Sequence, residues 1–316
     1  MVIIRSTVPI GATRNIFKPI LDKSNKKYNL AFCPERTAEG DAINELKVLP
    51  QIIGGIDDES VERAAGLFSK ITNTVIRTSS LESAETIKLV CNCYRDVQFS
   101  LANEIALISG SLGLNPYEII QASNIGYPRS NIANPGFVGG ACLDKDPHIL
   151  FDSLKQYNFD PALLKYARSL NENLPNIVAE NIVKKLEKIG KGKDSKIYIA
   201  GIAFKGNPET NDLRGSHSIK LIERIKKSGY NNIFGHDFVV SKEEIEKLGL
   251  IYATPPEGFN NADCVVIANN NKKYQNPEIE DLIGTLKKPS LLVDIWGIFN
   301  KKSVEKLGVI YSGIGI

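Results

Sequence analysis

The sequence lacks the patterns that mark membrane proteins and nucleic-acid-binding proteins. No apolar run reaches the ~18 residues that a membrane-spanning helix needs. The formal net charge is only +3, and the lysines are scattered rather than gathered in a basic stripe with interleaved aromatic residues. We therefore expect neither a membrane nor a nucleic acid among the partners of this chain.

Cysteine and histidine are scarce and poorly spaced for metal binding. The five cysteines include no C-x-x-C pair, and Cys91 and Cys93 are too close in sequence to share a helix face. The three histidines show no ligand spacing. We therefore expect no metal and no disulfide framework, and reduced thiols indicate a cytoplasmic protein. The G-x-G-x-x-G fingerprint of dinucleotide-binding turns is also absent.

What the sequence does contain is an alternation of strand and helix patterns that is interrupted once. The first part predicts strands at residues 1–6, 28–33, 51–56 and 73–78, with helices at 12–21 and 60–70. The middle part predicts only helices, at residues 83–110, 116–122, 147–155, 161–170 and 175–189. The last part predicts strands at 196–203, 232–236, 264–268 and 291–294, with helices at 216–228, 241–248 and 277–283.

These patterns predict an α/β protein in three parts. Strands that alternate with helices favour a largely parallel sheet in the first part and a doubly wound α/β domain in the last. The predicted domains are residues 1–82, 83–189 and 190–316, and a glycine- and lysine-rich linker opens the third.

A glycine-rich turn in the middle part ends in a single cysteine. Gly139 and Gly140 precede Cys142, and Asp146 follows four residues later. Glycines let a backbone approach a ligand closely or adopt positive φ, and backbone amides and Lys145 beside a thiol favour the thiolate. If a helix begins near Cys142, Asp146 lies one turn on and on the same face, which suits covalent catalysis. The alternative is a buried, inert cysteine.

Two loops follow predicted strands, where open α/β sheets bind their ligands. Thr7 lies after the first strand, and its hydroxyl suits either a bound water or ligand or the capping of a turn. Glu35 and Glu39 follow the second strand. On one helical face they would suit acid/base work or the orientation of a sugar hydroxyl; otherwise they are charges on a solvated loop.

Two further pairs suit binding or catalysis. Lys88 and Asn92 are one turn apart on the long predicted helix, where they would stabilise an alkoxide and orient a water. The alternative is an ordinary amphipathic helix with an extended lysine. Lys205 and Arg214 flank a loop between a strand and a helix N-terminus, which suits a diphosphate or is a charged surface loop.

In their order and spacing these motifs resemble the UDP-glucose/GDP-mannose dehydrogenase family over the whole chain. The motifs are Thr7-Val8-Pro9, Cys33-Pro34-Glu35-Arg36, Lys88 with Asn92-Cys93-Tyr94-Arg95-Asp96, Gly139-Gly140-Ala141-Cys142 with Asp146-Pro147, and Phe204-Lys205 with Asp212-Leu213-Arg214. The resemblance implies oxidation of the C6 hydroxyl of a UDP-sugar to a carboxylate with two NAD, a reaction of polysaccharide biosynthesis.

The resemblance also implies roles for single residues. Cys142 would capture the C6 aldehyde as a thiohemiacetal, which is oxidised to a thioester and then hydrolysed. Lys88 would stabilise oxyanions and Asn92 would orient substrate or water. Asp146 and Thr7 would position the water, and Glu35 would be the base of the hydrolysis. The residues implied to bind the UDP-sugar are Glu39, Arg129, Gly139, Lys205 and Arg214, and those implied to lie at NAD are Thr7, Glu35 and Lys205.

Arg129 matches an arginine that reaches a neighbouring subunit's substrate in the family. The helix at residues 83–110 resembles the family's dimer-forming helix, so the resemblance implies a homodimer.

Three departures qualify the match. The family's opening strand and glycine-rich NAD loop are absent, Ala141 occupies a position that helps to separate sugar classes, and Trp296 stands where an arginine is common.

The prediction is therefore a truncated NAD-dependent nucleotide-sugar 6-dehydrogenase with a truncated Rossmann-like first domain. We expect it to keep the UDP-sugar half-site and the catalytic cysteine and to bind NAD poorly. The main alternative is an inactive remnant that binds nucleotide sugar or only dimerises. A metal- or flavin-dependent oxidoreductase is a weaker alternative, because the sequence lacks the ligands.

Overall fold

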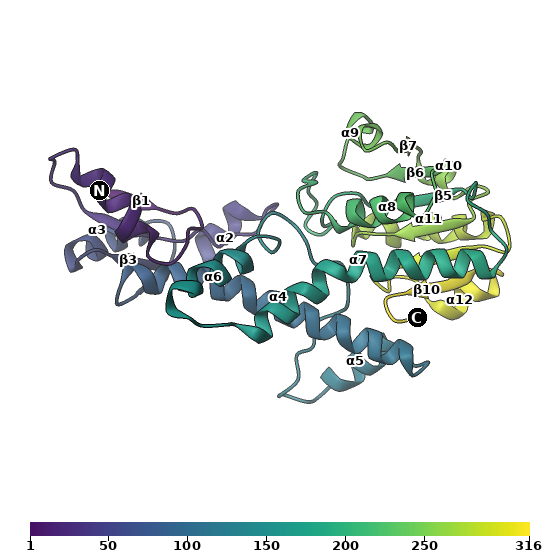
Figure 1. Ribbon diagram of the computed structural model, residues 1–316, viewed down its shortest axis with the longest axis horizontal. Helices are drawn as coiled ribbons and strands as arrows, with labels where there is room; N and C mark the ends of the chain where they lie inside the picture. Colours follow the sequence, from purple (N-terminus) through teal and green to yellow (C-terminus); the bar gives the residue numbers. More distant parts are fainter. The chain divides into compact units, whose positions relative to one another are not determined.

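The computed structural model describes all residues from Met1 to Ile316 and divides them into two compact units. One unit comprises Met1–Arg95 and Cys142–Lys165, and the other comprises Asp96–Ala141 and Tyr166–Ile316. Two long helices, α4 (Leu81–Ser111) and α7 (Ala162–Lys188), contribute residues to both units (Figure 1). No helix is both long enough and apolar enough to cross a membrane.

The first unit contains a four-stranded sheet in the order β1-β2-β3-β4. Its strands are β1 (Val2–Ile4), β2 (Leu30–Phe32), β3 (Gln51–Gly55) and β4 (Val75–Arg77). β1 and β2 are parallel, as are β3 and β4, but β2 and β3 are antiparallel. The prediction of a largely parallel sheet missed that pair. The segment between β2 and β3 carries only the short helix α2 (Ala42–Val48), so the chain turns back instead of crossing the sheet.

Helices cover both faces of this sheet. Ala64, Ala65 and Phe68 of α3 (Asp58–Phe68) pack on one face, and Leu81 and Ala84 of α4 pack on the other. The predicted helix at 12–21 is a π-helical turn, η1 (Thr13–Phe17), continued by α1 (Lys18–Asp22). The unit is completed by α6 (Asp146–Leu154) and the short 3₁₀ helix η2 (Lys155–Tyr157).

The second unit contains a six-stranded, wholly parallel sheet, which confirms the predicted doubly wound domain. Its order is β7-β6-β5-β8-β9-β10. The strands are β5 (Ile197–Ala200), β6 (Ile233–His236), β7 (Ile251–Tyr252), β8 (Cys264–Ile267), β9 (Leu291–Asp294) and β10 (Ile310–Gly313). The strand order reverses between β5 and β8, and ligands bind at such switch points, outside the carboxyl ends of the strands.

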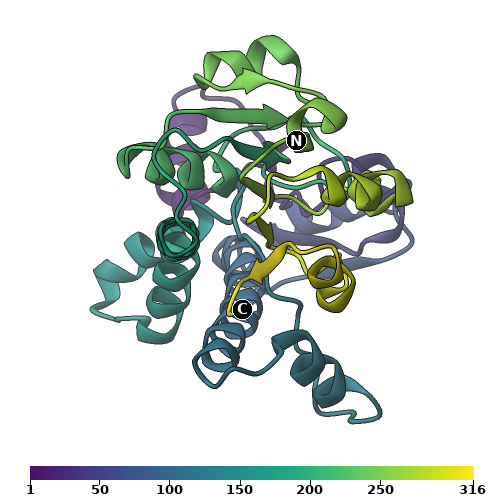
Figure 2. The same ribbon diagram turned by 90° about the vertical axis from the view of Figure 1, so that its right-hand side faces the viewer.

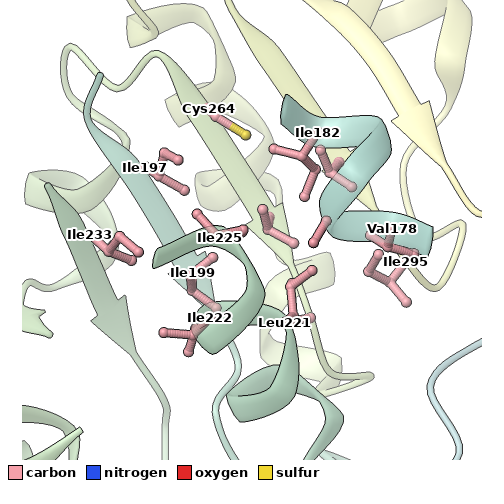
Figure 3. Packing of buried hydrophobic residues seen from close by; sticks show 14 of the residues in the cluster. Val178, Ile182, Ile197, Ile199, Leu221, Ile222, Ile225, Ile233, Cys264 and Ile295 are labelled. Carbon is pink, nitrogen blue, oxygen red and sulfur yellow. The ribbon is translucent and has the colours of Figure 1, made fainter. Parts of the chain in front are cut away.

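Two helix layers enclose this sheet. Apolar side chains of α7, α8 (His217–Lys227) and α9 (Lys242–Lys247) form a core on one face, part of which Figure 3 shows with Val178, Ile182 and Leu221. α10 (Pro255–Phe259), α11 (Pro277–Leu282) and α12 (Lys301–Lys306) cover the other face, and Figure 2 shows the sheet between the layers. The remaining helices are α5 (Pro116–Asn124), η3 (Lys272–Gln275) and η4 (Ile283–Thr285).

The two helices predicted at 161–170 and 175–189 are one helix, because α7 continues through Pro175. Proline removes one backbone hydrogen bond inside a helix, so the sequence pattern predicts a helix start at Pro175. The buried residues Leu174 and Val178 on either side of Pro175 pack in the core, and this packing keeps the helix continuous. The short elements α2, α10, α12, β7 and β10 were not predicted, because they are too brief to show a periodic pattern.

Candidate active site

Two helices of the first unit bring three of the predicted catalytic residues together. α4 carries Lys88 and Asn92 one turn apart, both buried, and α6 begins with the fully buried Asp146. The side-chain amide of Asn92 donates to Oδ2 of Asp146 across 2.5 Å, and Lys145 Nζ donates to Oδ1 across 2.6 Å. Both carboxylate oxygens of Asp146 thus have a donor, and the Asn92 bond joins α4 to the first turn of α6.

Cys142 lies in the turn just before α6 and is exposed, so the interpretation of this residue as a buried thiol is wrong. Its carbonyl accepts the backbone N–H of Asp146 at 2.9 Å, which is an α-helical turn ahead of the helix proper. Cys142 therefore precedes Asp146 by one turn, as Lys88 precedes Asn92. The hydrogen bond between Asn92 and Asp146 joins these two turns.

The loop that carries Thr7 is tied to the same two helices by residues that the sequence analysis missed. Glu85 lies on α4, one turn before Lys88, and its buried carboxylate accepts the N–H groups of Gly11 at 2.5 Å and Thr13 at 2.8 Å. On α6, the hydroxyl of Ser153 accepts the N–H of Ile10 at 3.1 Å. An acidic residue among apolar neighbours on a helix was the only sequence signal for Glu85.

Glu35 and Glu39 do not share a helical face, because residues 33–39 form no helix. Glu35 instead pairs with Arg5 at 2.5 Å and accepts the backbone N–H groups of Arg36 and Thr37. Burial acts to raise the pKa of Glu35, but the Thr37 hydrogen bond and the charge of Arg5 outweigh it and hold the pKa below its usual value. Glu39 is exposed.

The glycine-rich turn before Cys142 packs against the loop that follows β5, and both lie in the second unit. Gly140 donates its N–H to the carbonyl of Gly215 at 3.1 Å and has a φ of +98°. A Cβ at Gly140 would lie 2.5 Å from the Phe204 ring, and one at Gly139 would lie 2.1 Å from the Gly215 carbonyl oxygen. The close approach of two backbones therefore requires Gly139, and the positive φ and the contact with the Phe204 ring require Gly140.

The predicted nucleotide-sugar residues Lys205 and Arg214 flank that loop. Lys205 Nζ lies 5.4 Å from the centre of the Phe204 ring. The exposed guanidinium of Arg214 donates to the carboxylate of Asp212 at 2.7 and 3.0 Å. The hydrogen bond from Arg214 lowers the pKa of Asp212 below its usual value.

Side chains that follow β6 and β8 hold the backbone after β5, and the sequence analysis missed them. Asp237 accepts the N–H groups of Ile202 at 2.8 Å and Ala203 at 3.0 Å. Asn269 donates to the same carboxylate, and Asn270 accepts the N–H of Gly206 at 2.8 Å. The loop is thus fixed at the switch point, the place where open α/β sheets bind their ligands.

Arg129 and Trp296 lie elsewhere in the second unit. Arg129 is exposed, and its guanidinium stacks on the ring of Tyr127, with 4.5 Å to the ring centre. Trp296 Nε1 donates to the carbonyl of Ala268 at 3.1 Å, and its ring leaves no room for a Cβ at Gly136, which would lie 2.5 Å away. Trp296 is therefore a packing residue.

The fold and these sites define a class: an α/β protein with a doubly wound domain, a buried amide–carboxylate pair, and an exposed thiol one helical turn before the carboxylate. Comparison with known families narrows this further. The profiles of the UDP-glucose/GDP-mannose dehydrogenase family match residues 1–72 (NAD binding domain), 82–173 (central domain) and 198–301 (UDP binding domain). The chain belongs to this family, and the family's cofactor is NAD.

Its relatives include named nucleotide-sugar dehydrogenases. The chain is 32% identical over 315 residues to the UDP-N-acetyl-D-mannosamine dehydrogenase of Methanocaldococcus jannaschii, covering 98% of this chain and 68% of the relative. It is similar in structure to the UDP-D-ManNAc dehydrogenase of Pyrococcus horikoshii, with a TM-score of 0.87, 30% identity, and coverage of 100% of this chain and 72% of the other. An NDP-N-acetyl-D-galactosaminuronic acid dehydrogenase from Methanosarcina mazei Go1 superposes with a TM-score of 0.84 at 26% identity, covering 100% and 69%.

Proposed function

We propose that this chain oxidises the C6 hydroxyl of UDP-N-acetyl-D-mannosamine to a carboxylate through a covalent adduct on Cys142. The names of the relatives support the choice of sugar. The observation that carries the chemistry is the buried hydrogen bond between Asn92 and Asp146, with the exposed Cys142 one turn before the carboxylate.

The proposed reaction consists of two hydride transfers and one hydrolysis. In the first step a hydride leaves C6 and the hydroxyl proton leaves to solvent, which gives the aldehyde. The sulfur of Cys142 then adds to the aldehyde carbon, and the thiol proton moves to the oxygen. Loss of a second hydride and of that proton gives a thioester. Water then breaks the C–S bond, which releases the carboxylate and restores the thiol. NAD, when bound, accepts each hydride.

The chain's own residues stabilise and orient these species. Lys88 is a buried cation near Asn92, and in a site with little water a fixed cation stabilises a developing oxyanion strongly. Asn92, Asp146 and Thr7 orient the substrate or the attacking water. Glu35 is the proposed base: its lowered pKa keeps it ionised at neutral pH, and it is a correspondingly weak proton acceptor.

We further propose which of the predicted binding residues contact each ligand. Thr7 and Glu35 follow the carboxyl ends of the parallel strands β1 and β2. Open α/β sheets bind cofactors outside these strand ends, so both positions suit contact with the reacting end of NAD. We assign Lys205, which follows β5, to both ligands. The residues assigned to the UDP-sugar alone are Glu39, Arg129, Gly139 and Arg214.

We also propose that the chain forms a homodimer along α4. Val90, Tyr94, Leu101 and Ile108 are exposed and recur at intervals of four and seven residues, so they form one apolar stripe. A contiguous exposed apolar surface of this kind marks a protein–protein contact. The division into domains at residues 82/83 and 189/190 is part of the same proposal. So is a cytoplasmic location, in which the five cysteines, none of them in a disulfide, stay reduced.

The test is NADH formation with UDP-N-acetyl-D-mannosamine, measured against Cys142→Ala. At a high NAD concentration, which offsets the weak NAD binding predicted for this chain, we expect two NADH per sugar from the unchanged chain. Cys142→Ala should give at most one, because the aldehyde is then not captured for the second oxidation. Cys91→Ala, at the other thiol that is not buried, is the matched control and should retain turnover. Binding of the nucleotide sugar without NADH formation by the unchanged chain would favour the inactive, sugar-binding alternative.

A further inference from the structure

A buried polar network in the second unit lies behind the loop that leads to Cys142. α4 contributes Asp96 and Asn103 to it, and α7 contributes Arg168 and Asn171; each is more than nine-tenths buried. Arg168 Nη1 lies 3.1 Å from Oδ1 of Asp96, and the amide of Asn171 donates to the same oxygen at 2.9 Å. Asn103 donates to Oδ1 of Asn171 at 3.1 Å.

The network ends on the backbone of residues 136–138. Asn103 accepts the N–H of Gly136 at 2.9 Å and donates to the Gly136 carbonyl at 3.1 Å. Arg168 Nη2 donates to the carbonyl of Val138 at 3.0 Å. Three hydrogen bonds from two helices thus fix the first half of the glycine-rich loop.

A buried charge pair of this kind is weak evidence for a role in stability alone. Replacing a buried ion pair with apolar residues is often neutral or stabilising, since the desolvation of both charges offsets their attraction. The Asp96–Arg168 pair, however, is built into a set of directed bonds to a loop backbone. The second half of that loop is fixed independently, by the bond from Gly140 to Gly215. Cys142 follows Gly140 by two residues, so these contacts limit where its backbone can lie.

We propose that Asp96, Asn103, Arg168 and Asn171 are positioning residues for the loop that carries Cys142. They act on the thiol through the backbone of Gly136 and Val138 and do not touch the reacting atoms. The inference rests on the proposed function of Cys142 as the nucleophile. It also gives a role to Asp96, which belongs to a motif shared with the family but has no part in the proposed chemistry.

The decisive variant is Asn103→Leu, which keeps the side-chain volume and removes both bonds to Gly136. Three quantities are measured on the full chain: amide hydrogen exchange at Gly136, the pH profile of Cys142 alkylation by iodoacetamide, and kcat and KM for the UDP-sugar. We expect faster exchange at Gly136, a changed alkylation profile, and a kcat lower by roughly 10- to 100-fold with KM changed by less than about threefold, because misplacing a reacting group by about 1 Å has effects of this size.

The matched control is Lys191→Met, which breaks the largely buried pair between Lys191 and Asp263 at 2.7 Å, in the same unit and without contact to the loop. It should lower the midpoint of thermal unfolding and leave Cys142 alkylation and kcat unchanged. If Asn103→Leu behaves like this control, the proposal is overturned. If Asn103→Leu does not fold, Asn103→Ser and Arg168→Lys replace it. Lysine keeps a cation beside Asp96 but loses the planar fork that also reaches Val138. Arg168→Lys should therefore keep more of the chain's stability than of its normal profile of Cys142 alkylation.

The two proposals fail differently. If the unchanged chain gives no NADH but Asn103→Leu alters alkylation of Cys142, the proposed oxidation is wrong and the positioning of the loop is supported. If the unchanged chain turns over, and Asn103→Leu matches it in kcat and in alkylation, the oxidation is supported and the positioning role is wrong.

Discussion

The side-chain amide of Asn92 donates a hydrogen bond to the carboxylate of Asp146 across 2.5 Å, although 53 residues separate the two in sequence and each lies on a different helix. Asp146 is fully buried, and its second oxygen is bound by Lys145. The bond fixes the first turn of α6, which begins four residues after Cys142, against the helix that carries Lys88.

Replacing Asn92 with leucine should therefore weaken both stability and activity. One oxygen of a buried carboxylate would lose its donor, at a cost of about 1–3 kcal/mol in the free energy of unfolding. Urea denaturation measures this loss, and the rate of NADH formation should fall with it. Asn176→Ala, which removes only an exposed bond to Asn173, should change neither quantity.

Replacing Glu85 with glutamine should loosen the loop that carries Thr7. Glutamine offers one acceptor oxygen where Glu85 offers two, so its NH₂ group would face the N–H of Gly11 or Thr13. We expect the free energy of unfolding to fall by about 1–3 kcal/mol and hydrogen exchange to be faster at those two amides. The comparison is Glu59→Gln, since Glu59 makes only an exposed pair with Arg63 at 3.6 Å. Unchanged exchange at Gly11 and Thr13 would count against the assignment.

The thiols should differ in their reaction with iodoacetamide. Cys142 is exposed and Cys91 partly exposed, and the remaining three, Cys33, Cys93 and Cys264, are buried. Burial also raises the pKa of Cys33 to about 12, so its thiolate is scarce at neutral pH. Peptide mapping by mass spectrometry should find Cys142 modified first and the buried three only after denaturation. Early labelling of Cys33 would show that β2 is not packed as described.

A charge in the apolar stripe of α4 should prevent dimer formation. Leu101→Glu places a carboxylate in the middle of the stripe, and burying an unpaired charge in an apolar interface is strongly unfavourable. Light scattering coupled to gel filtration should give a dimer for the unchanged chain and a monomer for the variant. The control is Ile125→Glu, which adds the same charge at an exposed apolar residue outside the stripe. A dimer that survives Leu101→Glu would exclude α4 as the contact.

Asp294 should make stability fall as pH rises through the weakly acidic range. Burial raises its pKa to about 6, against the hydrogen bonds from Phe299, Tyr311 and Trp296 that lower it. Because the folded state holds this proton more tightly than the unfolded state, the contribution is complete below about pH 4 and is lost as pH rises to about 6. The expected contribution of Asp294 to the free energy of unfolding is roughly 2–3 kcal/mol.

Other carboxyl groups titrate in the same pH range. The measurement is therefore the difference in the free energy of unfolding between the unchanged chain and Asp294→Asn. Urea denaturation at a series of pH values from acid to neutral should show the unchanged chain losing stability relative to the variant as pH rises. A difference that stays constant across this series would mean that Asp294 has the same pKa in the folded and unfolded states and that burial does not raise it.

The sequence predicted which elements exist better than how they pair. Hydrophobic periodicity is local, so it located the strands at β5, β6, β8 and β9 and the long helix α4 to within a few residues. The antiparallel pairing of β2 with β3 depends on how the chain returns to the sheet, and no local pattern encodes it. Pro175 misled the prediction because its local effect ends a helix, whereas packing of Leu174 and Val178 in the core keeps α7 continuous.

The candidate active site shows the same division between what the sequence predicts and what packing decides. Residue types and spacing within one segment identified Cys142 with Asp146 and Lys88 with Asn92, because one helical turn relates each pair. The same reasoning was wrong for Glu35 and Glu39, whose segment forms no helix.

By itself, then, the sequence determined the α/β, helical and α/β order of the parts and the short-range pairs, which follow from the fixed geometry of a helical turn or a strand. It also carried the motifs by which the chain resembles its family. Only the tertiary structure decided that Asn92 meets Asp146, that Glu85 holds the loop after β1, and that a buried network from Asp96 to Gly136 lies behind the cysteine loop. These contacts join segments far apart in the chain, and they form because a buried polar group must find a partner wherever the fold places one.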